Sequence, residues 1–334
     1  MHDILLAGGG PAGAAAAIAA RCEGSPVRLV ERKATFRHKV CGEFISSDAS
    51  EILAALHVWD DFQALGPSRI RRCVLHLGNR SRHWTLPECS WGLSRLLLDR
   101  LLMDKAASVG VTISRGEPFD PTPAHRKESR LIIASGRKPR RESGDRLFGF
   151  KAHFEGPCDD AVELFFQDYG YAGVSGIEGN RTNVCGIAPE SVLRRHAFDF
   201  DQLTLRAGPL AERLRPLRRC IPWIVAGPLS FSMPSRHARD ENVYAAGDSL
   251  GFIDPYTGTG ILNALLTGRL AGVAAARRIP APEYLAMCRT LLRRPFLVSA
   301  VLRGLVGHSQ THRLSRCVPG QLLFQWTRAS WSHV

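Results

Sequence analysis

The chain of 334 residues carries a formal net charge of +13, with 45% hydrophobic and 22% charged residues, a composition that excludes a disordered chain and fits a folded protein with a sizeable core. No apolar run approaches the roughly 20 residues of a membrane span, and nothing near residue 1 has the features of a secretion signal. The nine cysteines form no C-x-x-C pair, which argues against a disulfide framework and a zinc site, so we expect a cytoplasmic protein with reduced thiols.

The first 33 residues contain the most informative pattern. Residues 4–7 form a short apolar run typical of a buried parallel strand, and residues 14–21 form an alanine-rich helix. A second strand over residues 27–30 ends on Glu31. Between the first strand and the helix lies a G-x-G-x-x-G fingerprint, which consists of Gly8, Gly10, Pro11, Ala12 and Gly13.

This order of strand, glycines, helix, strand and acid predicts a dinucleotide site. Gly8 permits the tight turn, Gly10 lets backbone N–H groups approach a pyrophosphate, and Gly13 lets the helix pack closely on the strand. The positive end of the helix favours the phosphates. Glu31 is placed to accept hydrogen bonds from a ribose. Small residues at these positions would also serve close helix packing alone. The presence of strand, glycines, helix, strand and acid in this order favours a dinucleotide site over that alternative.

The next part of the chain predicts a mixture of helices and strands. Residues 34–47 form a loop that we expect to return across the nucleotide. In chain order, the pattern then predicts a helix over 48–65, strands over 70–77 and 83–86 joined by a turn at 78–79, a helix over 94–109, and strands over 111–114 and 131–134.

Residues 147–235 predict a second, antiparallel sheet. Strands are expected over 147–154, 161–167 and 182–187, with an aromatic, glycine-rich link at 169–173, a helix over 198–214, and a loop or edge strand over 223–232. His153 alternates with apolar residues in the first of these strands. A hydrogen-bonded sheet histidine explains it more simply than a general base, which stays an alternative.

A second motif follows in the last third of the chain. A short strand over 243–246 ends in Gly247-Asp248, where a carboxylate could bind a ribityl or ribose hydroxyl; an ordinary turn aspartate is the simpler alternative. The turn at 254–259 opens a long helix from Ile261. Gly258 and Gly260 leave N–H groups free at the start of that helix, where the anionic part of a flavin could bind.

These motifs together resemble one family. The fingerprint, the loop His38-Lys-Val-Cys-Gly42, the strand into Gly-Asp and the turn Asp254-Pro-Tyr-Thr-Gly-Thr-Gly-Ile261 are similar to the FAD-dependent geranylgeranyl reductase family. That family belongs to the glutathione-reductase-like flavoproteins, together with aromatic hydroxylases and flavin halogenases. The resemblance covers most of residues 1–280. It is specific at the FAD contacts and weak in the substrate region.

The resemblance implies a role for each matched residue. Gly8, Gly10 and Gly13 would cradle FAD, together with Pro11 and Ala12. Glu31 would bind the ribose, Arg32 would lie near the adenosine, and Arg95 would lie near the phosphates or the ribityl chain. Gly247 and Asp248 would bind the ribityl chain or the pyrophosphate, and the isoalloxazine would lie at Gly258, Gly260 and Ile261. Cys41 and Gly42 would lie beside the flavin. Cys41 is the candidate catalytic residue, as a proton donor; a small residue that packs on the ring is the alternative.

Two departures bear on the choice within this group of flavoproteins. Ser135-Gly136 stands where hydroxylases usually have Asp-Gly, and the W-x-W-x-I-P signature of halogenases is absent. The stretch over 116–130 is short and proline-rich for the usual three-stranded meander. The resemblance therefore favours reduction or dehydrogenation of carbon–carbon bonds. A monooxygenase, a halogenase and a non-catalytic FAD-binding protein are the alternatives.

The predicted fold class is α/β: a Rossmann-like FAD-binding domain, an inserted antiparallel-sheet substrate domain and a helical C-terminal region. The expected ranges are 1–69, 92–146 and 236–280 for the FAD domain, 70–91 and 147–235 for the substrate domain, and 281–334 for the C-terminal region.

The expected partner is a hydrophobic or aromatic small molecule, free or bound to a carrier. NAD(P)H or a separate reductase would supply the electrons to FAD. The charge of +13 would suit an acidic carrier or peripheral contact with a membrane, although an arginine-rich solvated surface accounts for it more simply. No nucleic-acid-binding pattern accompanies the charge, so nucleic acid is not an expected partner.

Overall fold

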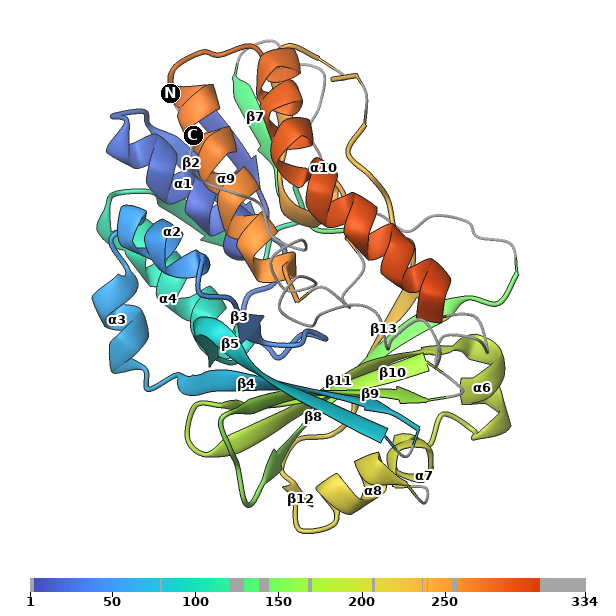
Figure 1. Ribbon diagram of the computed structural model, residues 1–334. Coiled ribbons are helices and arrows are strands. Elements are labelled where there is room, and N and C mark those ends of the chain that lie inside the picture. Colours follow the sequence, from blue (N-terminus) through green and yellow to red (C-terminus); the bar gives the residue numbers. More distant parts are fainter. Residues whose placement is uncertain are drawn as a thin grey trace.

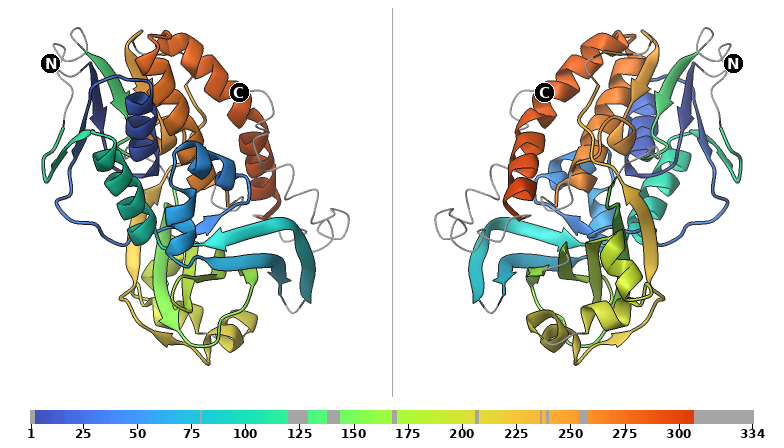
Figure 2. Two further views of the ribbon diagram at one scale, coloured as in Figure 1. Left: turned by 90° about the vertical axis from the view of Figure 1, so that its left-hand side faces the viewer. Right: turned by 90° about the vertical axis from the view of Figure 1, so that its right-hand side faces the viewer.

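The computed structural model describes residues 3–78, 80–119, 129–137, 144–167, 170–205, 208–235, 237–238, 240–253 and 258–306, with side chains as far as residue 299. The described residues form two sheets that lie one above the other, with most of the long helices packed around the upper one (Figures 1 and 2). The first sheet is five-stranded, in the order β14-β7-β1-β2-β6, and all its pairs are parallel.

The parallel sheet is built from short apolar strands, as expected for strands buried on both faces. Its strands are β1 (Ile4–Ala7), β2 (Val27–Glu31), β6 (Thr112–Arg115), β7 (Arg130–Ile133) and β14 (Val243–Ala245). The long helices of this half are α1 (Pro11–Cys22), α4 (Arg95–Ser108), α9 (Gly260–Ala276) and α10 (Ala281–Val306). One hydrophobic core joins α1, α4, α9 and α10 to the sheet.

Helices α1 and α9 pack with their backbones in contact (Figure 1). A Cβ atom added at Gly268 would lie 2.2 Å from the carbonyl oxygen of Ala12, and one added at Gly272 would lie 2.2 Å from that of Ala16. Only glycine at these two positions of α9 permits this approach to the backbone of α1. The contact fixes the start of α1, where the fingerprint lies, against the C-terminal part of the chain.

The second sheet has nine strands, in the order β12-β8-β11-β10-β9-β4-β5-β3, and β13 also pairs with β8. All its pairs are antiparallel except β4 with β9, which is parallel, so the sheet is mixed rather than purely antiparallel. Its strands are β3 (Phe44–Ile45), β4 (Ser68–Leu77), β5 (Arg80–Gly92), β8 (Leu147–Glu155), β9 (Ala161–Gln167), β10 (Gly170–Ile177), β11 (Arg181–Pro189), β12 (Arg218–Arg219) and β13 (Ile224–Leu229).

Short helices complete the fold. They are α2 (Ala49–Ala55), α3 (Trp59–Ala64), α6 (Glu190–Arg195), α7 (Phe200–Thr204) and α8 (Pro209–Leu214), with the 3₁₀ turn η1 (Gly247–Ser249). Helices α7 and α8 cover the lower face of the second sheet through two apolar clusters (Figure 1). None of the helices in the described part of the chain has the length and apolar content that crossing a membrane requires.

Three predictions of secondary structure were wrong, two of them because of a local backbone feature. The helix expected over 48–65 is divided into α2 and α3, since His57 adopts φ +55° between them. The helix expected over 198–214 is divided into α7 and α8, since Gly208 adopts φ +137° directly before α8; Phe198, with φ +57°, lies before α7. The expected link at 169–173 lies largely within strand β10.

The other expected elements are present within a few residues, apart from the lengthening of the strand over 83–86 into β5. Asn79 of the expected turn, Tyr169, residues 254–257 and residues 307–334 lie outside the described residues. The α/β class with a Rossmann-like core is confirmed. The exact domain boundaries stay a prediction.

Candidate functional site

The glycine fingerprint forms the turn between β1 and α1 that the sequence predicts. Gly8 has φ +104°, and a Cβ at Gly13 would lie 1.8 Å from the carbonyl oxygen of Gly8. Both positions therefore require glycine for the protein's own backbone. Gly10 differs, because the nearest atom to a Cβ there is Nη2 of Arg95, at 3.7 Å. The space in front of Gly10 is open, and its neighbour is a cation.

Helix α1 begins with the features of an anion site. Gly10 is its N-cap and provides no side-chain cap, and Pro11 occupies the first turn. The sequence has no acidic residue in that turn, so the positive end of the helix dipole is not neutralised from within. A phosphate group in front of Gly10 would meet both the helix end and Arg95.

Glu31 ends β2 beside this turn. Its carboxylate accepts hydrogen bonds from the backbone N–H of Gly9, at 2.7 Å, and of Lys33, at 2.8 Å. The acid is thus fixed at the edge of the turn, where a ribose adjoining the phosphates would lie. Arg32 follows as an exposed side chain.

Arg95 is the first residue of α4, and its guanidinium is held by two hydrogen bonds to one carboxylate, that of Asp99. Its guanidinium donates to Asp99 Oδ1 at 2.9 Å and to Asp99 Oδ2 at 3.2 Å, and Lys39 Nζ donates to the same carboxylate at 2.7 Å. Burial opposes the charge on Arg95, but Asp99 and the thiol of Cys41 outweigh it and raise its pKa. Arg95 is therefore a fixed cation at the glycine turn.

The Gly247-Asp248 motif lies beside the start of α1, because a Cβ added at Gly247 would lie 2.8 Å from the Cβ of Ala12. The N–H of Gly247 donates to Thr267 Oγ1 at 2.9 Å, which attaches the turn to α9. Protein atoms surround much of Asp248, yet its side chain is exposed to solvent. Burial raises the pKa of Asp248, and the charges of Arg95 and Arg137 act against this shift. Arg95 and Asp248, more than a hundred positions apart in the sequence, thus lie close enough for their charges to interact.

Cys41 lies at the end of the predicted return loop, half-buried. Its sulfur accepts a hydrogen bond from the N–H of Glu43 at 3.4 Å and interacts with the guanidinium of Arg95. Gly42 beside it is exposed. The loop is also close to the start of α9, because a Cβ at Gly258 would lie 3.2 Å from Cδ1 of Phe44.

The start of α9 has the expected character. None of the described residues has an atom within 4 Å of a Cβ added at Gly260, whereas Ile261 is 5% exposed and belongs to the main core. The structure therefore brings the fingerprint, Arg95, Asp248, the Cys41 loop and the α9 turn around the same region. Arg32 follows Glu31 at the edge of this region with its side chain exposed.

The residues present fit FAD on three counts. The turn is open only at Gly10, the position where a pyrophosphate approaches. An arginine and a helix N-terminus supply positive charge there. Asp248, whose burial destabilises its charge, is a carboxylate that gains from a hydroxyl donor. The role of each predicted residue in binding stays a prediction.

The prediction missed a buried charged cluster behind the Cys41 loop. Glu43, Lys151 and His153 are each 0% exposed, and Glu43 contacts both other side chains. The alternation Lys151-Ala-His153-Phe in β8 was the visible signal, since it places both polar residues on one face. Sequence alone did not show that this face is covered by the return loop.

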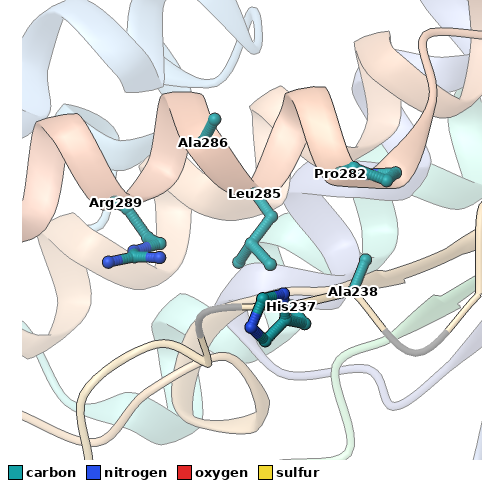
Figure 3. Close-up of a pocket in the computed structure, with 6 residues that line it drawn as sticks. All are labelled: His237, Ala238, Pro282, Leu285, Ala286 and Arg289. Carbon is teal, nitrogen blue, oxygen red and sulfur yellow. The ribbon is translucent and has the colours of Figure 1, made fainter.

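A separate surface pocket of about 240 Å³ lies between α10 and the segment before β14 (Figure 3). Leu285 forms its floor, and His237 and Arg289 face each other across it. None of the predicted site residues lines this pocket, so it is distinct from the candidate FAD site around Gly10, Arg95 and Asp248. The residues that line it are His237, Ala238, Pro282, Leu285, Ala286 and Arg289.

Comparison with known proteins identifies the cofactor domain and the relatives. Residues 1–141 match the family described as FAD binding domain. A digeranylgeranylglycerophospholipid reductase of Methanoculleus marisnigri is 27% identical over 333 residues, covering 84% of this chain and 78% of the relative. A second such reductase, from Methanopyrus kandleri, is 27% identical over 83% of this chain and 81% of the relative.

Solved structures show the same fold. A geranylgeranyl bacteriochlorophyll reductase-like protein of Thermoplasma acidophilum superposes with a TM-score of 0.74 at 19% identity, over 99% of this chain and 94% of the other. A flavin-dependent brominase superposes with a TM-score of 0.80 at 17% identity, over 98% and 94%. The solved structures show the same fold, and the matched FAD domain and the two reductase relatives agree with the resemblance drawn from the sequence; the chain is an FAD-dependent oxidoreductase.

Proposed function

We propose that the protein reduces carbon–carbon double bonds in the polyprenyl chains of a hydrophobic lipid, with Cys41 as the proton donor. The observation that carries this proposal is the position of the Cys41 sulfur, which interacts with Arg95 and with the N–H of Glu43. The names of the two archaeal relatives support the substrate class. The departures from the hydroxylase and halogenase sequence patterns favour reduction over oxygen chemistry.

Reduction of a double bond needs one hydride and one proton. Bound FAD in its reduced form supplies the hydride. The proton comes from the thiol of Cys41: the S–H bond breaks, a C–H bond forms at the second carbon, and the sulfur keeps the electron pair. The guanidinium of Arg95 and the N–H of Glu43 stabilise the resulting thiolate, since both already contact the sulfur. Water then returns a proton to the sulfur.

The other site residues bind and orient. Arg95 and the start of α1 meet the phosphates, and Glu31 and Asp248 accept hydrogen bonds from hydroxyl groups of the cofactor. Asp99 keeps the Arg95 guanidinium in place through two hydrogen bonds. We propose NAD(P)H or a separate reductase as the source of electrons, because the sequence has one dinucleotide fingerprint.

The proposal is tested in an anaerobic single-turnover experiment. The purified holoprotein is reduced with dithionite and mixed with a detergent-dispersed geranylgeranyl ether lipid, and the product is analysed by mass spectrometry. The expected product is 2 mass units heavier for each double bond reduced, and in D₂O each reduction introduces solvent deuterium. A product that contains hydroxyl or halogen in air, with oxygen consumed only when lipid is present, would establish the monooxygenase or halogenase alternative instead.

The role of Cys41 is tested with Cys41→Ala and Cys41→Ser. Both variants should keep FAD and its visible spectrum. Loss of a proton donor typically slows the chemical step by about 10²–10⁴-fold, so Cys41→Ala should lower the single-turnover rate by that amount. Serine, a poorer acid, should recover little of it. Wild-type rates in both variants would show that Cys41 only packs against its surroundings.

A further inference from the structure

A fully buried charged cluster lies beneath the Cys41 loop, and its side chains take no part in the chemistry proposed above. It consists of Glu43, Lys151 and His153, each 0% exposed. Buried charges are costly unless they are paired, and removing one partner leaves the other uncompensated. A cluster of this kind therefore needs an explanation beyond ordinary packing.

The register of the second sheet places the cluster. In the pair β8–β11, Lys151 lies opposite Cys185 and His153 lies opposite Asn183. Residues that lie opposite each other point to the same face, so these four side chains form one patch facing the loop. The alternate residues of β8, namely Phe150, Ala152 and Phe154, pack in the apolar clusters under the sheet.

Glu43 connects this patch to the parallel-sheet half of the protein. Its Oε1 accepts hydrogen bonds from the N–H of Arg95, at 2.6 Å, and from Lys151 Nζ, and its Oε2 pairs with His153 Nε2 at 2.7 Å. Burial alone would raise the pKa of Glu43, but His153 and Lys151 lower it below its ordinary value. The carboxylate is therefore ionised and held by three groups from two elements.

The backbone at Glu43 is in a conformation that glutamate rarely adopts, with φ +55°. A left-handed conformation is unfavourable for a residue with a Cβ, and it persists only where surrounding contacts determine it. In this conformation the N–H of Glu43 reaches the Cys41 sulfur, at 3.4 Å. Asn183 holds the same loop by donating to the carbonyls of Cys41 and Gly42, at 3.1 and 2.9 Å.

We propose that Glu43 is a positioning residue for Cys41: its carboxylate, held by Lys151, His153 and the backbone of Arg95, keeps residues 41–43 in the strained turn that fixes the thiol. This inference rests on the proposed role of Cys41 and names the part of the protein that places it. It also explains why Lys151 and His153 are buried in the second sheet. They hold the carboxylate from the substrate side, while Arg95 holds it from the cofactor side.

A metal site is the competing explanation of the same residues. Ligand atoms of His38, Glu43 and His153 lie within 4.8 Å of one another. Lys151 Nζ, however, occupies one carboxylate oxygen of Glu43, and its charge, like that of Arg95, opposes a bound cation. The His38 ring stacks edge-on against His153 at 4.9 Å between centroids. The contacts are those of an ion-pair network.

The test measures how well Cys41 is held, independently of turnover. FAD-loaded wild type and Glu43→Gln are treated with iodoacetamide, and the labelling rate of the Cys41 peptide is followed by mass spectrometry. Glutamine keeps the shape but not the charge, so the turn should relax and Cys41 should label at least about tenfold faster, with FAD still bound. Labelling at the wild-type rate in the FAD-loaded variant would overturn the proposal.

Glu178→Gln is the matched control. Glu178 is 4% exposed and also accepts a hydrogen bond from the start of α4, at 2.7 Å from the N of Ser94, but its other oxygen pairs with Arg181 instead of with Lys151 or His153. This variant should lower the thermal midpoint while Cys41 labels at the wild-type rate. Equal acceleration in both variants would show that Glu43 acts only through general stability, and would also overturn the proposal.

A second pair of variants decides the matter if Glu43→Gln does not fold. His153→Gln retains a nitrogen donor for Glu43, whereas His153→Leu removes it. Slow labelling in His153→Gln with fast labelling in His153→Leu is the expected result, and identical rates would contradict it. The proposed role of Cys41 as proton donor fails separately, through wild-type turnover in Cys41→Ser, and the labelling result stands in either case.

Discussion

Two glycines three residues apart should respond in opposite ways to the same substitution. At Gly13, an added Cβ would lie 1.8 Å from the carbonyl oxygen of Gly8, which is backbone and cannot move aside cheaply. At Gly10, the nearest atom would be Arg95 Nη2 at the ordinary contact distance of 3.7 Å, and the backbone angles of φ −78° and ψ −177° suit alanine. Gly13→Ala therefore strains the fold, and Gly10→Ala obstructs only the ligand.

The magnitudes follow from these contacts. Overpacking typically costs about 1–3 kcal/mol, and the overlap at Gly13 places it at or above the upper end. For a chain of this length about 3 kcal/mol corresponds to a fall of roughly 4 °C in the thermal midpoint. Gly10→Ala should leave the apoprotein as stable or more stable by about 0.4–1 kcal/mol, because alanine restricts the unfolded chain. A methyl group in the path of the pyrophosphate should weaken FAD binding by about 5- to 160-fold, from the same 1–3 kcal/mol.

Both quantities are measured on the purified proteins. Differential scanning calorimetry of the apoproteins gives the midpoints, and quenching of flavin fluorescence gives the dissociation constants. The reasoning is refuted if Gly10→Ala binds FAD as tightly as wild type, or if Gly13→Ala unfolds at the wild-type temperature.

Two further changes have expected signs. Asp248→Ala should weaken FAD binding by about 1.5–3 kcal/mol, the value of a hydrogen bond to a charged group, and titration calorimetry with FAD measures this loss. A melting curve should show the apoprotein to be no less stable, because burial raises the pKa of Asp248 and so disfavours its charged form. Glu43 and Asp99 have lowered pKa values: although burial opposes it, the cations beside them favour their charged forms. The folded protein therefore binds fewer protons than the unfolded chain, and stability measured by urea unfolding should be level near neutral pH and fall as the pH drops below about 4.5; a flat profile down to pH 3 would contradict this.

The cofactor half of the fold was predictable because its elements are determined by residues that are neighbours in the sequence. The apolar run at 4–7, the spacing of Gly8, Gly10 and Gly13 and the acid at the end of β2 each follow from neighbours in sequence. Arg95 and Asp248 were expected near the cofactor from the family resemblance. The structure places Arg95 beside Gly10 and close enough to Asp248 for their charges to interact.

What escaped prediction depends on contacts between distant segments. The hydrophobic pattern over 48–65 predicts one continuous helix. The break at His57 comes from its backbone conformation, which a hydrophobic pattern does not reveal. His153 was interpreted as a hydrogen-bonded histidine of an ordinary strand, and the burial of Lys151 beside it was not predicted. Their burial depends on the return loop, which begins more than a hundred residues earlier.

The close contact of α1 with α9 has a consequence for how the protein is made. The two helices meet backbone to backbone, and about 250 residues of chain separate the end of one from the end of the other. At about 5–20 residues per second, α1 leaves the ribosome roughly 10–50 s before its partner. Until then its contact face is alanine, which exposes little apolar surface and gives other chains little to bind. FAD should therefore be captured only by a nearly complete polypeptide, and a chain that stops before α9 should remain without it.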